Sequence, residues 1–199
     1  MNEFYHELLT PIIYKWVSTR ENAHKSKQSC SVCFCNDKYH AKIDFHEHDL
    51  IELSIIDKET EESLFYLHFE MHDLKTTTQN IQSFFDFLKN PIQKEEIHLE
   101  DKQNGRLKIL LSCTSGLTTS YYAYLMQEAL DKNHNQIEVD AINYLELDSI
   151  QEQYDYILLA PQISYRYQEL RQKYGEKVLM IDTIDFASGN VNKVLNQII

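Results

Sequence analysis

The sequence predicts a chain of two parts, an α+β domain followed by an α/β domain built on a four-stranded parallel sheet. Three observations lead to this prediction. In the first half, apolar and polar residues alternate through four consecutive segments, which is typical of an antiparallel sheet with one wet face. In the second half, short apolar segments alternate with helical ones, as in a parallel sheet with helices on both faces. A mostly polar and charged stretch lies between the halves.

The N-terminal domain is assigned to residues 1–92. Its first segment, from Glu3 to Arg20, has apolar residues at helical spacing, and Pro11 predicts a break or kink within that helix. A second helix with one apolar face is expected from Thr76 to Lys89. Four strands are expected between the helices, at 29–35, 40–46, 50–57 and 63–71. This domain is therefore a four-stranded antiparallel meander with two flanking helices, and its role is not indicated by the sequence.

Residues 93–105 are interpreted as a linker, because they are polar apart from two aliphatic residues and contain Asn104-Gly105. The second domain then spans residues 106–199. Its strands are expected at 107–112, 137–142, 156–160 and 177–181. Its helices are expected at 117–133, 147–153, 163–174 and 188–199. In parallel sheets of this kind, ligands bind beyond the C-terminal ends of the strands.

The overall composition excludes some classes of partner. The formal net charge is −12, whereas nucleic acids and anionic membranes need a positive field on the protein that binds them. No apolar run approaches the roughly 20 residues of a membrane-spanning helix, and the acidic N-terminus lacks the features of a signal peptide. We therefore expect a cytoplasmic protein without direct membrane insertion, whose four cysteines are thiols rather than a disulfide framework.

The strongest indication of chemistry follows the first strand of the second domain. Cys113 ends an apolar run, and a loop of hydroxyl residues around Gly116 leads from it into a helical pattern. A helix N-terminus leaves backbone N–H groups without partners and carries about half a positive charge. Both effects favour a thiolate and a bound phosphate. Judged by spacing alone, a buried structural cysteine is an equal alternative, since cysteines without a disulfide are often buried.

The loop contains no cation. A loop of the tyrosine-phosphatase type needs an arginine six positions after the nucleophile to hold phosphate with two hydrogen bonds, and Thr119 stands at that position. No Lys or Arg occurs between Cys113 and Lys132, and no Gly-Lys-Ser/Thr sequence indicates a Walker A loop. This favours a carrier that passes a phosphoryl group on over an enzyme that hydrolyses it.

Three ordered motifs resemble one family. The first is Cys113-x-x-Gly116-x-Thr118-Thr119-Ser120 followed by Met126-Gln127-Glu128-Ala129, and the second is Tyr154 to Tyr165, with Ala160-Pro161-Gln162 at its centre. The third runs from Val178 to Leu195. Together they resemble the IIB component of the lactose/cellobiose (chitobiose) branch of the bacterial sugar phosphotransferase system, over residues 106–199 and not before. This family has the phosphate-loop sheet that low-molecular-weight phosphatases share.

The resemblance implies that Cys113 accepts phosphate from a phosphohistidine on a IIA protein and passes it to a sugar held by the membrane permease IIC, with no cofactor and no metal. It also implies partner-facing roles for Gln162 and Tyr165. The phosphate-binding residues that it implies are Thr114, Ser115, Gly116, Leu117, Thr118, Thr119 and Ser120. The sequence departs from the family pattern at Thr114-Ser115, at Tyr121-Tyr122, at Ala160 and at Phe186.

Two other functions are open. The chain is a regulatory or interaction protein if its IIB-like domain senses phosphorylation while residues 1–92 bind an unknown partner. It is a low-molecular-weight phosphatase or arsenate reductase if the phosphoryl group on the loop is hydrolysed. Thr119, at the position where such a loop needs arginine, argues against this alternative. Cys30-x-x-Cys33-x-Cys35 with nearby histidines also invites a zinc interpretation, but no second cysteine pair follows, so we expect a cysteine-rich strand without a metal.

Overall fold

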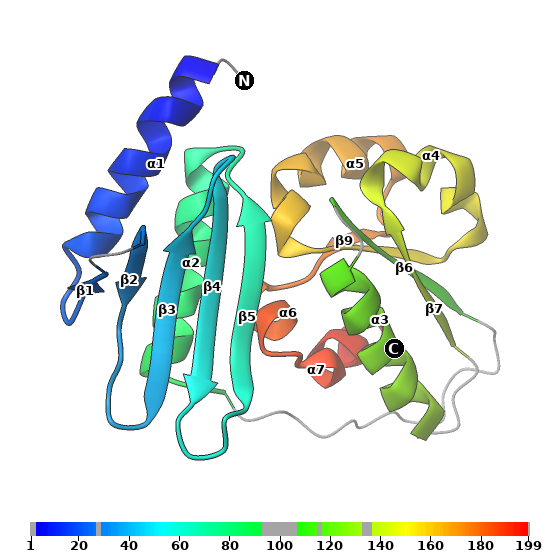
Figure 1. Cartoon of the computed structure of the whole chain (residues 1–199). Coiled ribbons are helices and arrows are strands. Elements are labelled where there is room, and N and C mark those ends of the chain that lie inside the picture. The colour runs from blue at the N-terminus through cyan, green and yellow to red at the C-terminus, as the bar shows by residue number, and fades with distance from the viewer. Residues whose placement is uncertain (1–2, 27–28, 93–106, 115–116, 133–136, 199) are drawn as a thin grey trace. The chain divides into compact units, whose positions relative to one another are not determined.

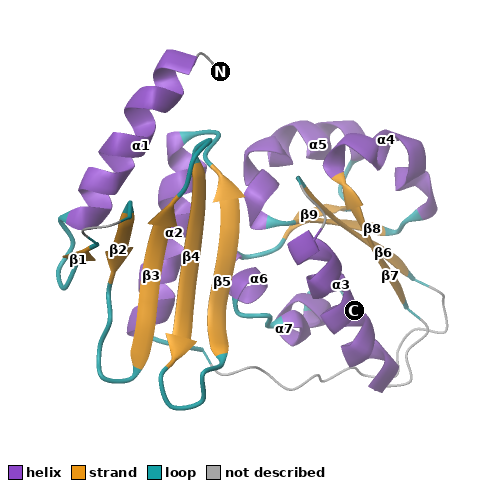
Figure 2. Cartoon of the chain, viewed as in Figure 1, coloured by secondary structure: helices purple, strands orange, loops and turns teal. Residues whose placement is uncertain are grey.

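The computed structural model describes residues 3–26, 29–92, 107–114, 117–132 and 137–198. The chain divides into two compact units, residues 1–92 and 93–199, each of which is described by itself. Figures 1 and 2 show an antiparallel sheet in unit 1 and a parallel sheet in unit 2. The linker predicted at 93–105 lies outside the described residues.

Unit 1 contains a five-stranded antiparallel sheet in the order β1-β2-β3-β4-β5. Its strands are β1 (His24–Lys25), β2 (Ser31–Cys33), β3 (Tyr39–Phe45), β4 (Leu50–Asp57) and β5 (Ser63–Glu70). The four predicted strands are therefore present, and a two-residue strand that the sequence did not indicate pairs with β2. The buried residues of β3, β4 and β5 alternate with partly exposed ones, so one face of the sheet is buried and the other is wet, as predicted.

Both helices of unit 1 pack on the buried face of the sheet. In α1 (Glu3–Ser18), Tyr14 stacks edge-on against Phe45, and in α2 (Leu74–Lys89), Phe84 does the same against Phe65. The Asp73 carboxylate caps α2 by accepting from the N–H of Thr76 at 2.8 Å. The break expected at Pro11 is absent, since α1 runs through it. Proline has no N–H to donate to the carbonyl four residues earlier in the helix. Because Pro11 is exposed, water can bind that carbonyl instead.

Unit 2 is built on a four-stranded sheet in the order β7-β6-β8-β9, in which every neighbouring pair is parallel. The strands are β6 (Lys108–Cys113), β7 (Glu138–Asn143), β8 (Tyr156–Leu159) and β9 (Val178–Met180). Each lies within about one residue of its predicted range. Strand β6 is a central strand, and its residues from Ile109 to Cys113 are all buried. The predicted parallel sheet is therefore confirmed.

Helices cover both faces of this sheet (Figure 1). The cluster around Leu110 and Leu159 packs under α4 (Leu147–Ile150) and α5 (Tyr167–Tyr174) through Leu147 and Leu170. On the other face lies α3 (Leu117–Lys132), which contacts α7 (Val191–Asn196). The remaining elements are α6 (Thr183–Ala187) and the 3-10 helices η1 (Tyr144–Glu146), η2 (Gln151–Gln153) and η3 (Pro161–Arg166).

Of the predicted C-terminal helix, 188–199, only the part from Val191 to Asn196 forms, as α7. The helix before it, α6, was not predicted. Gly189 separates them with a positive φ of 68°, a conformation that favours glycine. Within the ranges that the structure describes, no helix is long and apolar enough to cross a membrane.

Candidate functional site

Cys113 is the last residue of the central strand β6, and α3 begins four residues later at Leu117. Only 2 % of Cys113 is exposed. Across the ladder it stands opposite Asn143, the last residue of β7. The cysteine therefore lies at the C-terminal edge of the parallel sheet, which is the edge where ligands bind in such folds. The four cysteines of the chain all lie in described residues and form no disulfide.

Asn143 ties the end of β7 to the loop after Cys113. Its side-chain Nδ2 donates to the carbonyl oxygen of Thr114 at 2.7 Å, and its Oδ1 accepts from the N–H of Leu145 at 3.0 Å, capping η1. A carbonyl oxygen carries partial negative charge, so an anion-binding loop must keep its carbonyls turned away from the anion. Asn143 binds the Thr114 carbonyl and holds it toward β7. Sequence reasoning missed this residue, although an asparagine at the end of an edge strand, two residues before a helical N–H, is a recognisable cap.

The predicted loop residues differ in exposure. Thr114 and Thr118 are half-buried, Ser120 is exposed, and Leu117 opens α3. Ser115 and Gly116 lie outside the described residues. Thr119 is fully buried, and its Oγ1 has no hydrogen-bond partner among the described residues. The structure therefore brings hydroxyl residues to the N-terminus of α3, next to Cys113.

Two of the residues that the sequence analysis singled out, Tyr122 and Phe186, contact each other. Tyr122 on α3 stacks on Phe186 of α6 with ring centroids 4.8 Å apart and an interplanar angle of 21°. Burial raises the pKa of the Tyr122 hydroxyl well above its ordinary value, with the negative charges of Asp185 and Asp182 adding to the effect. The two aromatic substitutions thus form one packing pair that joins α3 to the C-terminal segment.

The third sequence motif builds a capped turn and a buried ion pair. Asp182 caps α6 by accepting from the N–H groups of Ile184 at 2.9 Å and Asp185 at 3.3 Å. The Asp185 carboxylate is buried and lies 2.9 Å from Lys193 Nζ, and it accepts from Asn190 Nδ2 at 3.2 Å. Burial raises the pKa of Asp185, against the opposing effect of Lys193. These residues hold α6 and α7 in place behind α3.

The second motif lies at the start of η3. Pro161 occupies the first turn of η3, where its missing N–H is not needed. Gln162 is only 5 % exposed. Tyr165 is half-buried and packs against the cluster around Leu110.

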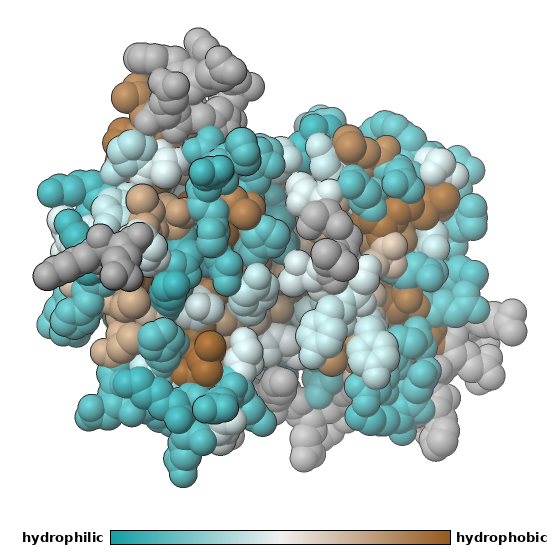
Figure 3. Space-filling view, viewed as in Figure 1, coloured by the Kyte–Doolittle hydropathy of each residue, from teal (hydrophilic) through white to brown (hydrophobic). Residues whose placement is uncertain are grey.

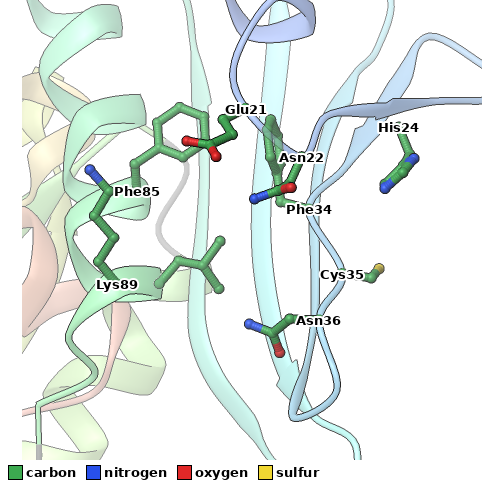
Figure 4. A pocket seen from close by; sticks show the side chains of 9 residues that line it. Glu21, Asn22, His24, Phe34, Cys35, Asn36, Phe85 and Lys89 are labelled. Carbon is green, nitrogen blue, oxygen red and sulfur yellow. The ribbon is translucent and has the colours of Figure 1, made fainter.

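In the part of the chain that the structure describes, no group of three or more His, Cys, Asp or Glu side chains converges as a metal site requires. A pocket of about 430 Å³ lies in unit 1 between α2 and the loop after β2. Phe34, Phe85 and Leu88 line it, with Glu21 and Lys89 among its polar residues (Figure 4). None of its lining residues belongs to the segment from Cys113 to Ser120.

Unit 2 matches one known protein family. Residues 108–197 match the family model described as PTS system, Lactose/Cellobiose specific IIB subunit. Unit 2 is a IIB domain of the lactose/cellobiose type. The match includes Cys113, Asn143 and all four strands of the parallel sheet. The sequence-based recognition of this family, and the limit of the resemblance to the second half of the chain, are therefore confirmed.

Individual relatives of the IIB domain are similar over the same half. The oligo-beta-mannoside-specific EIIB component of Bacillus subtilis is 28% identical over 78 residues, which are 39% of this chain and 76% of that protein. The lactose-specific IIB domain of Streptococcus pneumoniae is 21% identical, with a TM-score of 0.42 over 47% of this chain and 97% of that one. The cellobiose-specific IIB protein of Borrelia burgdorferi is 28% identical, with a TM-score of 0.41 over 47% and 89%.

Unit 1 matches a different family. Residues 12–87 match the family model described as Immunity protein TriTu. The match runs from within α1 to within α2 and includes all five strands of the antiparallel sheet. Sequence reasoning did not recognise this family.

Proposed function

We propose that the chain is a IIB-type phosphoryl carrier of a sugar phosphotransferase system and that Cys113 is the residue that carries the group. The observation on which this rests is the position of Cys113, buried at the end of the central strand of a IIB domain and directly before α3. In the proposed step, the Cys113 thiolate attacks the phosphorus of a phosphohistidine on a IIA protein. The S–P bond forms as the N–P bond breaks, and the imidazole leaves.

In the second step, a hydroxyl of a sugar bound by the membrane protein IIC attacks the phosphorus. The O–P bond forms, the S–P bond breaks, and the sulfur leaves as a thiolate. The sugar belongs to the lactose, cellobiose or chitobiose class. Residues Thr114 to Ser120 bind the phosphoryl group through neutral N–H and O–H donors. The absence of Lys and Arg from residues 114–131 supports relay over hydrolysis, because no fixed cation would stabilise the charge that builds up when water attacks.

A labelling experiment tests this proposal. The full chain is incubated with the general phosphotransferase proteins, a IIA protein of the lactose/cellobiose branch and phosphoenolpyruvate that carries a radioactive phosphoryl group. We expect label that is lost in Cys113→Ser and retained in the matched control Cys30→Ser, which changes an exposed cysteine. Label that persists in Cys113→Ser would exclude the carrier role, and release of inorganic phosphate without a sugar would favour the phosphatase alternative.

For unit 1 we propose a second function, the binding and neutralisation of a toxin protein, which the match of residues 12–87 to an immunity-protein family supports. Because α1 and α2 both cover the same face of the sheet, the opposite face is available for a partner. On that face Asp44 and Glu52 stand directly opposite each other across β3 and β4. Tyr66 on β5 is 39 % exposed, and tyrosine is among the residues that contribute most to protein interfaces.

The net charge of unit 1 favours a basic partner. Residues 1–92 contain 15 Asp and Glu and 9 Lys and Arg, so their formal net charge is −6, half of the −12 of the whole chain. Figure 3 shows polar side chains gathered over the turn between β4 and β5, where Glu59, Glu61 and Glu62 are exposed. Acidic surfaces of this kind speed association with cationic partners.

Growth measurements test the immunity function. Cells that express the toxin partnered by a TriTu immunity protein are grown with and without the full chain. We expect the chain to restore growth and the double variant Glu52→Lys, Tyr66→Ala to lose this effect, while Cys113→Ser keeps it. Equal growth with and without the wild-type chain would exclude immunity against that toxin, and loss of protection in Cys113→Ser would place the activity in unit 2.

A further inference from the structure

Cys33 and Cys35 lie on the wet face of the unit 1 sheet, each opposite a basic side chain. Cys33 pairs with Lys42 in the β2–β3 register. The N–H of Phe34 donates to the carbonyl of Ala41 at 2.8 Å, and the N–H of Asn36 donates to that of Tyr39 at 3.1 Å. These two bonds continue the ladder beyond Cys33 and place Cys35 opposite His40.

The thiol of Cys35 contacts the imidazole of His40. The distance from Cys35 Sγ to His40 Nδ1 is 3.2 Å. His40 is exposed and Cys35 is half-buried, so solutes reach both groups. Cys35 is among the residues that line the pocket of unit 1, but Figure 4 shows that its side chain points away from Phe85 and Lys89, which agrees with its place on the wet face.

An imidazole beside a thiol can take the thiol proton and leave the thiolate, which is the nucleophilic form of cysteine. Cys33 lies two residues away on the same face. Burial raises the pKa of its thiol, and the neighbouring Cys35 adds to this effect. The geometry thus places a thiol that contacts an imidazole next to a second thiol.

We propose that Cys35 is a modification site for hydroperoxides and that Cys33 resolves the product. The Cys35 thiolate attacks one oxygen of hydrogen peroxide, so that an S–O bond forms and the O–O bond breaks. The hydroxide that leaves takes the thiol proton back from the His40 imidazole and becomes water. The sulfur of Cys33 then attacks the Cys35 sulfenic acid. An S–S bond forms, the S–O bond breaks, and the oxygen leaves as water with the Cys33 proton. The two thiols are oxidised by two electrons, and one peroxide is reduced to two waters.

The resulting disulfide is readily reversed. Two residues of extended chain separate the Cα atoms by roughly 6.5 Å at about 3.3 Å per residue, near the upper end of the range for disulfides. Closing the bond therefore pulls on the end of β2, and strained, exposed disulfides are reduced more easily than relaxed ones. This inference does not depend on phosphorylation of Cys113.

The test is oxidation of the full chain with hydrogen peroxide, with dimedone as the trap for sulfenic acid and mass spectrometry as the readout. We expect a Cys33–Cys35 disulfide in the wild type that dithiothreitol removes. In Cys33→Ser, the dimedone adduct should accumulate on Cys35. In His40→Gln, oxidation of Cys35 should slow roughly tenfold, while thermal unfolding of the variant matches that of the wild type, which shows that the variant is folded. Cys30→Ser, which changes an exposed cysteine outside the pair, should behave as the wild type.

Three results would overturn the proposal. The first is oxidation of Cys30 as fast as that of Cys35, because exposure alone would then explain the reactivity. The second is a Cys35 rate that His40→Gln does not change, because the imidazole would then have no role. The third is a Cys33→Ser variant that gives no more dimedone adduct than the wild type, because Cys33 would then not be the resolving thiol.

Discussion

Replacing Asn143 by aspartate should separate the two hydrogen bonds that this side chain makes. An aspartate oxygen can still accept from the N–H of Leu145, and capping a helix by a carboxylate is at least as favourable as by an amide. The bond to the Thr114 carbonyl is lost, because a carboxylate has no proton to donate. The variant therefore keeps the cap of η1 and removes the restraint on the loop after Cys113.

The magnitude follows from two effects. A neutral hydrogen bond contributes about 1 kcal/mol net. The new carboxylate also repels the phosphoryl group, because Asn143 and Cys113 are paired across neighbouring strands. At a separation of about 8 Å and an effective dielectric constant of about 20, each unit of phosphoryl charge costs about 2 kcal/mol. Labelling of Cys113 should therefore fall by a factor of about 30 or more.

The assay compares Asn143→Asp with Asn143→Leu in the phosphoenolpyruvate-driven labelling of Cys113, with thermal unfolding measured in parallel. The leucine variant loses both hydrogen bonds and adds no charge. It should unfold at a lower temperature than the aspartate variant, yet be labelled faster. The reasoning is refuted if Asn143→Asp is labelled at the wild-type rate, or if labelling in the two variants follows their thermal stability.

Three further predictions concern the packing behind α3. Lys193→Met leaves the buried Asp185 carboxylate without its cation and should destabilise unit 2 by about 2–4 kcal/mol at about pH 7. Because the folded pKa of Asp185 is raised, its contribution to stability is present at acidic pH and lost as the pH rises through that pKa, so the variant should recover stability at about pH 4 in urea unfolding. Gly189→Ala should cost about 1–2 kcal/mol in the same measurement, from its positive φ, since the added Cβ would meet Leu125 Cδ1 at an ordinary 3.5 Å. Tyr122→Phe should leave the melting temperature unchanged or higher, because it removes a buried hydroxyl that has no partner among the described residues.

The strands of both units were predictable because their residue patterns have a short period that burial enforces. Ile109 to Leu111 form a continuous apolar run, which is typical of a strand covered on both faces, and β3 to β5 alternate because one face is wet. The two-residue strand β1 was missed because His24 and Lys25 are both exposed, so that no apolar pattern marks it. The expected break at Pro11 did not occur. The residue pattern could not indicate this, because it does not show whether water can replace the lost helical donor.

The position of Cys113 between a strand and a helix was predictable, and its surroundings were less so. Cys113 follows directly from a strand, a glycine loop and a helix in sequence order. Asn143 is 29 residues from Thr114 along the chain, and it reaches the Thr114 carbonyl only because β6 and β7 are neighbouring strands. Similarly, Gln162 is a polar residue whose burial the sequence did not indicate. Contacts between distant segments are fixed by the register of the sheet, which the linear pattern does not contain.

The most direct test of the carrier function is the chemical identity of the phosphorylated residue. The full chain is phosphorylated from phosphoenolpyruvate through the general phosphotransferase proteins and a IIA protein, and the labelled peptide is then identified by mass spectrometry. Our account predicts a single phosphoryl group on Cys113, which is lost when the acceptor sugar and its IIC protein are added. Phosphate on a histidine or on any other cysteine, or a Cys113 that stays unmodified while the IIA protein is fully phosphorylated, would contradict it.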